Sequence, residues 1–253
     1  MSAVVFAFKT FIVLHIIVGL VGLVTFWVPV IGRKGAEAHR RWGRVFTYCM
    51  IAAGTFATCI ATCSLIAPLE THSTFPPPFT DEGLVRGIFG WMMIYLAVLT
   101  INLAWYGWKC VENKKAHEKN RGFGNLALQA LVFLGALNCI LQGALLGQPL
   151  MMLASIIGFA TVATNLRFIF ARAPAPNDWL REHLKGLVGA GISVYTAFLA
   201  LGAVRLVPSL ALSPQLWAVP LVGGLTIILY HWRKLPRRPR VAADASVVHG
   251  AAS

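Results

Sequence analysis

The sequence predicts an all-α fold: a polytopic membrane helical bundle of seven transmembrane helices, with its amino terminus outside and its carboxyl terminus in the cytoplasm. Of the 253 residues, 57% are hydrophobic and only 12% are charged, whereas about a quarter of the residues of a soluble domain are charged. The apolar residues form runs of about 20, the length that crosses the hydrocarbon core of a bilayer. The Lys and Arg residues gather in alternate loops, as the positive-inside rule requires.

Seven stretches of the chain are long and apolar enough to cross a bilayer. The first is a retained span, because its apolar run exceeds the roughly 7–15 residues of a signal peptide and no A-x-A site follows it. We expect one domain over residues 1–235 and a disordered cytoplasmic tail over residues 236–253. The predicted spans are Val4–Ile31, Val45–Ala67, Leu84–Trp108, Phe123–Leu146, Leu150–Phe170, Leu184–Val207 and Pro214–Trp232.

The basic residues set the orientation of these spans. Among the 22 Lys and Arg residues, only Lys9, Arg86 and Arg205 lie outside the regions around the first, third and fifth interspan loops and the tail. Those regions therefore face the cytoplasm, and an even number of spans would destroy the pattern. The net charge of +13 is explained by topology in the cell inner membrane, so nucleic acid is not an expected partner. The expected partners are the bilayer and the anionic lipid headgroups near the basic loops.

Polar side chains lie toward the cytoplasmic ends of the third, fourth and fifth spans. Arg167 has apolar neighbours on both sides, and it either snorkels to the interface or binds an anionic group. No Asp or Glu lies within a predicted span, which argues against proton-driven pumps and cation transporters. The predicted ligand-binding residues are Asn102, Gln129, Asn165 and Arg167.

His15 is the one histidine deep within a predicted span. An ionisable residue at that depth is a candidate functional group, and the alternative is a neutral imidazole that bonds a neighbouring helix. As a haem ligand it would need an axial partner. Met92, Met93 or His72 are the candidates, since a second deep histidine is missing.

A second metal hypothesis uses cysteine. Cys59 and Cys63 are four residues apart and share one helix face. Together with His15 they suit copper or zinc. The alternative is apolar packing, the usual role of a buried free cysteine.

Three further histidines precede the even-numbered spans on the cytoplasmic side. If they converge, their imidazoles suit zinc, copper or iron. The alternative is that they cap helices or meet lipid headgroups at the interface. These residues are His39, His117 and His183.

Several short motifs lie in the predicted spans and in the loops before them. They are His15, Gly19, His39, Arg40 and Gly43, then Asn165-Leu166-Arg167, and finally His183 with Thr196-Ala197-Phe198. They resemble the motifs of an uncharacterised family of bacterial multi-span membrane proteins of unknown function, which has a histidine and a glycine in the first span and an HR-x-x-G loop before the second. The resemblance implies a helical bundle and adds no established activity.

These observations leave three functional hypotheses. The first is a membrane protein without enzymatic activity that binds or moves a small ligand at the polar cluster. The second is a redox component that carries haem or a transition metal. The third is an assembly subunit that binds another membrane protein. The chain has no Ser-His-Asp order, phosphate-binding glycine loop or H-E-x-x-H motif, so a soluble catalytic domain is not expected.

Overall fold

The computed structural model of the chain describes residues 2–74, 77, 79–204 and 213–235, with backbone alone for residues 201–204. These residues form helices and no strand, which confirms the all-α prediction. The predicted tail, residues 236–253, and residues 205–207 of the sixth predicted span lie outside the described part.

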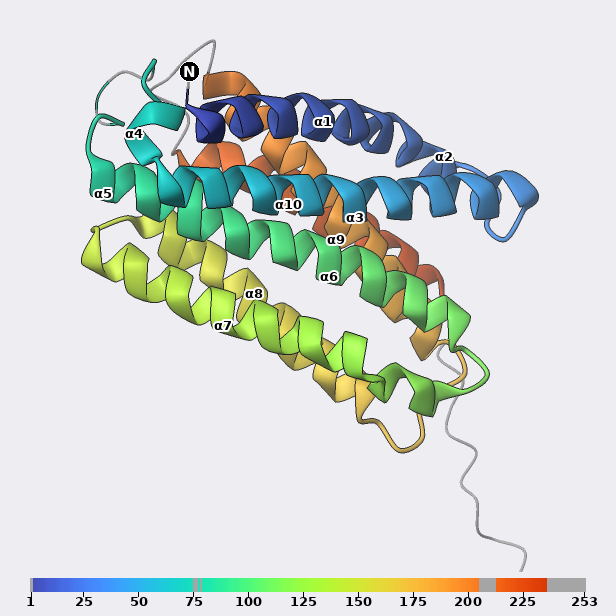
Figure 1. Cartoon of the computed structure of the whole chain (residues 1–253). Coiled ribbons are helices and arrows are strands. Elements are labelled where there is room, and N and C mark those ends of the chain that lie inside the picture. Colours follow the sequence, from blue (N-terminus) through green and yellow to red (C-terminus); the bar gives the residue numbers. More distant parts are fainter. Residues whose placement is uncertain (1, 75–76, 78, 205–212, 236–253) are drawn as a thin grey trace, which may run out of the picture.

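In the described part of the chain, seven long helical segments run lengthwise through the bundle, and short helices connect or interrupt them (Figure 1). The third long segment is continuous from α5 to α6 through a π-helical stretch, η1. In chain order the elements are α1 (Ala3–Thr25), α2 (Trp27–Ile31), α3 (Glu37–Ile66), α4 (Pro68–Thr71), α5 (Glu82–Val85), η1 (Arg86–Met92), α6 (Met93–Glu112), η2 (His117–Arg121), α7 (Phe123–Leu145), α8 (Pro149–Ile169), α9 (Asp178–Val204) and α10 (Pro214–Lys234).

Five of the segments in the described part of the chain are long and apolar enough to cross a membrane: α1–α2, α3, α5–α6, α7 and α8. The helices α9 and α10 fall outside this group. The first turns of α9 carry Asp178, Arg181, Glu182 and Lys185, and α10 ends in a basic turn. Five candidate spans are therefore established by length and composition among the described residues, and the predicted count of seven is not confirmed.

The first predicted span is interrupted rather than continuous. Helix α1 ends at Thr25, and α2 begins at Trp27. Pro29 explains the break, because proline has no N–H and its ring clashes with the carbonyl four residues earlier, here that of Thr25. The predicted span Val4–Ile31 is confirmed in extent, because Ala3–Ile31 is one candidate span, and the break at Phe26 divides it into two helices.

Two helices begin earlier than their predicted spans. Helix α3 starts at Glu37 rather than Val45, and α9 starts at Asp178 rather than Leu184. The added turns are rich in Arg and Glu, which have high helix propensity. Apolar length therefore underestimates helix length wherever a helix extends past the apolar layer.

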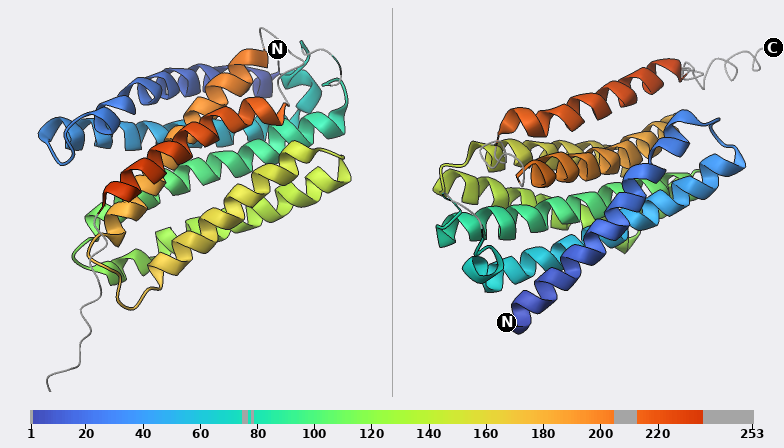
Figure 2. Two further views of the ribbon diagram at one scale, coloured as in Figure 1. Left: turned by 180° about the vertical axis from the view of Figure 1, so that it is seen from behind. Right: turned by 90° about the horizontal axis from the view of Figure 1, so that it is seen from above.

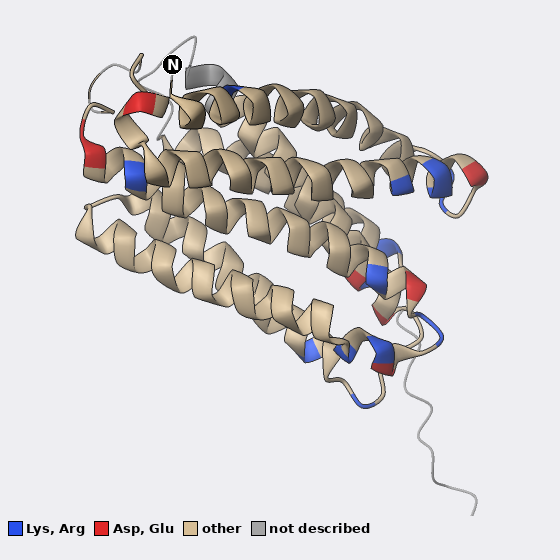
Figure 3. Ribbon diagram, in the orientation of Figure 1, with Lys and Arg blue, Asp and Glu red and all other residues tan. Residues whose placement is uncertain are grey.

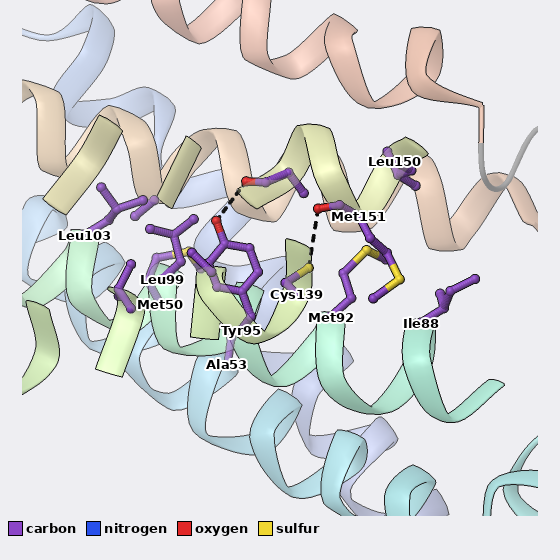
Figure 4. Packing of buried hydrophobic residues seen from close by; sticks show 14 of the residues in the cluster. Met50, Ala53, Ile88, Met92, Tyr95, Leu99, Leu103, Cys139, Leu150 and Met151 are labelled. Carbon is purple, nitrogen blue, oxygen red and sulfur yellow. Dashed lines mark hydrogen bonds between the residues drawn. The ribbon is translucent and has the colours of Figure 1, made fainter. Parts of the chain in front are cut away.

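Helix α6 is the centre of the bundle. It packs against α3, α7 and α9, while α1 covers α3, α8 covers α7 and α10 covers α9 (Figures 1 and 2). The main core lies between α3, η1, α6, α7 and α8, and the Tyr95 hydroxyl crosses it to donate to the Ala154 carbonyl at 2.8 Å (Figure 4). Every other long helix therefore takes its position from α6 or from one of its neighbours.

The outer surface of the bundle is apolar along its length. Large hydrophobic side chains are exposed on α1, α7, α8 and α10, where a soluble helix would carry polar residues. The charged residues gather at the two ends (Figure 3). We call the basic end the one formed by the α2–α3, α6–α7 and α8–α9 connections and the last turn of α10. The acids Glu70, Asp81 and Glu82 lie at the opposite end.

Helices α6 and α9 approach each other closely at a pair of glycines. A Cβ atom added to Gly186 would lie 2.7 Å from the Gly107 Cα atom and 2.8 Å from the Leu103 carbonyl oxygen. Both contacts are with backbone, which cannot move away as a flexible side chain can. Only glycine at position 186 therefore permits this approach, as small residues do in packed membrane helices.

We predict that Gly186→Ala lowers the free energy of unfolding by about 1–3 kcal/mol, the usual cost of overpacking. The measurement is thermal unfolding of the detergent-purified protein followed by circular dichroism. Gly19→Ala is the matched control, because a Cβ atom there meets nothing within 4 Å. Equal melting temperatures for Gly186→Ala and the control would show that the α6–α9 contact does not limit stability.

Candidate functional site

Three of the four predicted ligand-binding residues meet inside the bundle. Asn102 of α6, Gln129 of α7 and Asn165 of α8 are 0%, 2% and 0% exposed. We call these three residues the amide cluster. They lie close together because the polar positions of three adjacent helices fall at one level of the bundle.

The hydrogen bonds of the amide cluster centre on Gln129. Its Nε2 atom donates to Asn102 Oδ1 at 2.7 Å, and its Oε1 atom accepts from Asn102 Nδ2 at 3.4 Å and from Asn165 Nδ2 at 3.2 Å. Asn165 Oδ1 is buried and has no partner among the described residues. An amide oxygen left in this state costs about 1–3 kcal/mol.

Arg167 does not belong to the amide cluster. It is exposed, and it lies two positions after Asn165 on α8, which turns the two side chains about 200° apart around the helix. The structure therefore does not bring Arg167 together with the other three residues, and its exposed position agrees with a side chain that reaches the interface.

A charged group that the sequence analysis missed lies beside the next turn of α6. The Tyr106 hydroxyl donates to Glu182 Oε2 at 2.6 Å, and Lys185 pairs with the same carboxylate and donates to Thr164 Oγ1 at 3.1 Å. The side chains of Glu182 and Lys185 are only 15% and 16% exposed. The Glu-x-x-Lys spacing is visible in the sequence, but the predicted span begins at Leu184 and so leaves Glu182 outside it.

The three histidines of the basic end do not form one site. His39 Nδ1 bonds the Pro29 carbonyl at 3.2 Å, and His183 Nδ1 bonds the Gly107 carbonyl at 2.9 Å. His117 instead packs against Phe168, with ring centroids 4.7 Å apart. Within the described ranges, no three His, Cys, Asp or Glu side chains come close enough together to hold a metal ion. The three-histidine hypothesis is therefore not supported by the geometry.

His15 is held by a neighbouring helix, since its Nδ1 atom lies 2.9 Å from the Ala53 carbonyl of α3. The possible haem partner Met92 is fully buried in the main core (Figure 4). His72, another of the three candidates, stacks on Phe89 with ring centroids 4.4 Å apart. These side chains therefore make their contacts in different parts of the bundle. Among the described residues, His15, Cys59 and Cys63 also do not form a group that could hold a metal ion.

We predict that Gln129→Met destabilises the protein more than the loss of all three amides does. The single change leaves Asn102 Oδ1, Asn102 Nδ2 and Asn165 Nδ2 without their partner, at about 1–3 kcal/mol for each group. The triple variant Asn102→Leu, Gln129→Met, Asn165→Leu strands none, so its melting temperature should exceed that of Gln129→Met. Gln142→Met, on the same helix and outside the cluster, is the control.

The losses of stability in the single variants Asn102→Leu, Gln129→Met and Asn165→Leu can be added together. A triple variant whose loss of stability equals that sum would contradict the prediction. Such additivity would mean that the three amides act independently.

We predict that His72 makes stability fall with decreasing pH. Burial lowers the pKa of His72 from 6.5 to about 4, against a smaller opposite effect of its bond to the Pro68 carbonyl. Between those two pH values the unfolded chain binds the additional proton, so stability rises with pH. The loss between pH 7 and pH 4 is at most about 3 kcal/mol, and His72→Asn should remove it. The measurement is the melting temperature of both proteins at a series of pH values across this range. An equal change of melting temperature with pH in the two proteins would contradict the prediction.

Comparison of the chain with protein-family models, with curated proteins and with solved structures gave no match. The resemblance to a family of multi-span proteins therefore stays an expectation from the sequence, and the functional argument depends on the geometry of the amide cluster and its surroundings.

Proposed function

We propose that this chain is a seven-span protein of the cell inner membrane, with its amino terminus outside, that binds a small polar ligand at the amide cluster. The topology is supported by five helices of suitable length and by the apolar outer surface. It is also supported by α9 and α10, which run the length of the bundle beside the other five (Figure 2). Most of the Lys and Arg residues in the described part of the chain gather at one end (Figure 3), which in this topology is cytoplasmic.

The unpartnered Oδ1 atom of Asn165 is the main observation in support of a ligand at the amide cluster. Asn102 and Gln129 bond each other reciprocally and would suffice to link α6 to α7. Asn165 contributes a donor, Nδ2, which bonds Gln129 Oε1, and an acceptor, Oδ1, which has no partner among the described residues. A ligand that offers an N–H or O–H group to Asn165 Oδ1 would remove the cost of this buried acceptor.

The surroundings of the cluster favour an uncharged ligand. The three side chains are neutral, and the nearest turn of α6 toward the basic end carries Tyr106, whose hydroxyl is engaged by Glu182. The carboxylate of Glu182 is in turn paired with Lys185. A charged ligand would find no counterion within the amide cluster itself, and burying it there would be costly.

The topology predicts which positions react from outside the cell. In a cysteine-free background, Gln148→Cys in the α7–α8 connection should react in intact cells with a maleimide that cannot cross membranes. Lys115→Cys should react only after permeabilisation. Ser213→Cys, at the start of α10, distinguishes seven spans from five, because it lies outside only if α9 and α10 cross.

Reaction of Lys115→Cys in intact cells would overturn the orientation. Protection of Ser213→Cys until permeabilisation would instead retain the orientation and reduce the number of spans to five.

The ligand proposal predicts stabilisation by small neutral hydrogen-bond donors. Acetamide, urea and glycerol at millimolar concentration are suitable probes, and at least one should raise the melting temperature of the purified protein in a saturable way. Asn165→Leu should abolish the shift, whereas Gln142→Leu should keep it. A shift of equal size in Asn165→Leu would place the binding elsewhere, and the absence of a shift with every probe would count against a ligand of this class.

A further inference from the structure

A crevice of about 620 Å³ opens at the basic end, where α6 ends and α7 begins. It is separate from the amide cluster, which lies about one turn deeper on the same two helices, since Asn125 precedes Gln129 by four residues. The lining residues that matter here are Trp105, Lys109, Lys115, Lys119, Gly124 and Asn125.

The charge of the crevice is positive. Lys109 is paired with Glu112 at 2.5 Å and lies 4.7 Å above the Trp105 ring. Lys115 and Lys119 are exposed, and no carboxylate of the described chain forms an ion pair with either of them. Two uncompensated cations therefore face an open cavity.

Hydrogen-bonding groups without partners lie among the residues of the crevice. The amino terminus of α7 begins there, and its cap residue Gly122 supplies no side-chain bond, so its first N–H groups are available to an anion. The indole N–H of Trp105 is unpartnered. Asn125 is 5% exposed, and its Oδ1 atom also has no partner, so the site offers both donors and an acceptor.

An apolar face continues from this crevice along α7. Phe123, at the mouth, is 88% exposed, and Leu131, Leu134 and Leu141 are exposed further along the same helix. A free phosphate ion would gain no binding energy from such an apolar face. A lipid with an anionic headgroup uses both the charged crevice and the apolar side chains below it.

We propose that the crevice binds the headgroup of an anionic phospholipid with a free hydroxyl, of the phosphatidylglycerol class. The phosphate diester accepts hydrogen bonds from Lys115, Lys119 and the amino terminus of α7. The headgroup hydroxyl donates to Asn125 Oδ1, and an acyl chain lies along the exposed side chains of α7. This site goes beyond the proposed function, and it does not depend on ligand binding at the amide cluster.

The experiment is native mass spectrometry of the delipidated, full-length protein, titrated separately with phosphatidylglycerol, phosphatidylcholine and inorganic phosphate. Wild type should bind phosphatidylglycerol at least about tenfold more tightly than phosphatidylcholine, because the two lysines attract the net negative charge that only phosphatidylglycerol carries. The double variant Lys115→Gln, Lys119→Gln should lose this preference. The control Arg172→Gln, Arg233→Gln makes the same charge change at exposed positions outside the crevice and should retain it.

Three results would overturn the proposal. Equal affinity of the wild-type protein for the two lipids would show that the crevice does not select an anionic headgroup. An equal loss of preference in the control variant would show that only the overall charge of the protein matters. Displacement of phosphatidylglycerol by equimolar inorganic phosphate would assign the crevice to a free anion. Circular dichroism of both double variants shows whether each retains its helical content.

Discussion

The hydrogen bonds of Gln129 are the interaction on which the rest of the bundle depends. In an apolar interior, helices gain little from burying hydrophobic surface against one another, and a stranded amide is costly. Gln129 bonds Asn102 and Asn165 at once, and it therefore fixes the relative level of α6, α7 and α8. A slip of one turn along any of these helices would leave buried amides without partners, so the cluster specifies the packing register as well as stabilising it.

Helix α6 extends this constraint to the other side of the molecule. Its Gly107 permits the close approach of α9 at Gly186, and the carbonyl of Gly107 accepts from His183. One turn from Asn102, Tyr106 bonds Glu182 of the same partner helix. Successive turns of α6 thus contact α7 through amides and α9 through a carboxylate and a backbone carbonyl. The candidate site lies where these two sets of polar contacts meet, and a ligand there would contact the central helix.

Much of this arrangement could be predicted from the sequence. The bounds of α7 and α8 agree with the apolar runs to within one or two residues, because glycine, proline or polar residues bound both runs. The polar residues Asn102, Gln129 and Asn165 were expected at one depth, and they meet. Arg167 was misplaced, since depth along a helix does not give the direction of a side chain around it. The burial of Glu182 and the separation of His39, His117 and His183 arise from tertiary packing, on which a single sequence without a helix arrangement carries no information.

The measurement that tests the central claim most directly is a high-resolution density map of the full-length protein in a lipid nanodisc. The account predicts density that belongs to no protein atom within about 3 Å of Asn165 Oδ1, the distance of a hydrogen bond to a ligand or to an ordered water that occupies its place. It also predicts seven helices across the disc. A closely packed cluster in which a protein donor reaches Asn165 Oδ1 would contradict the ligand site and would leave the three amides with a structural role alone.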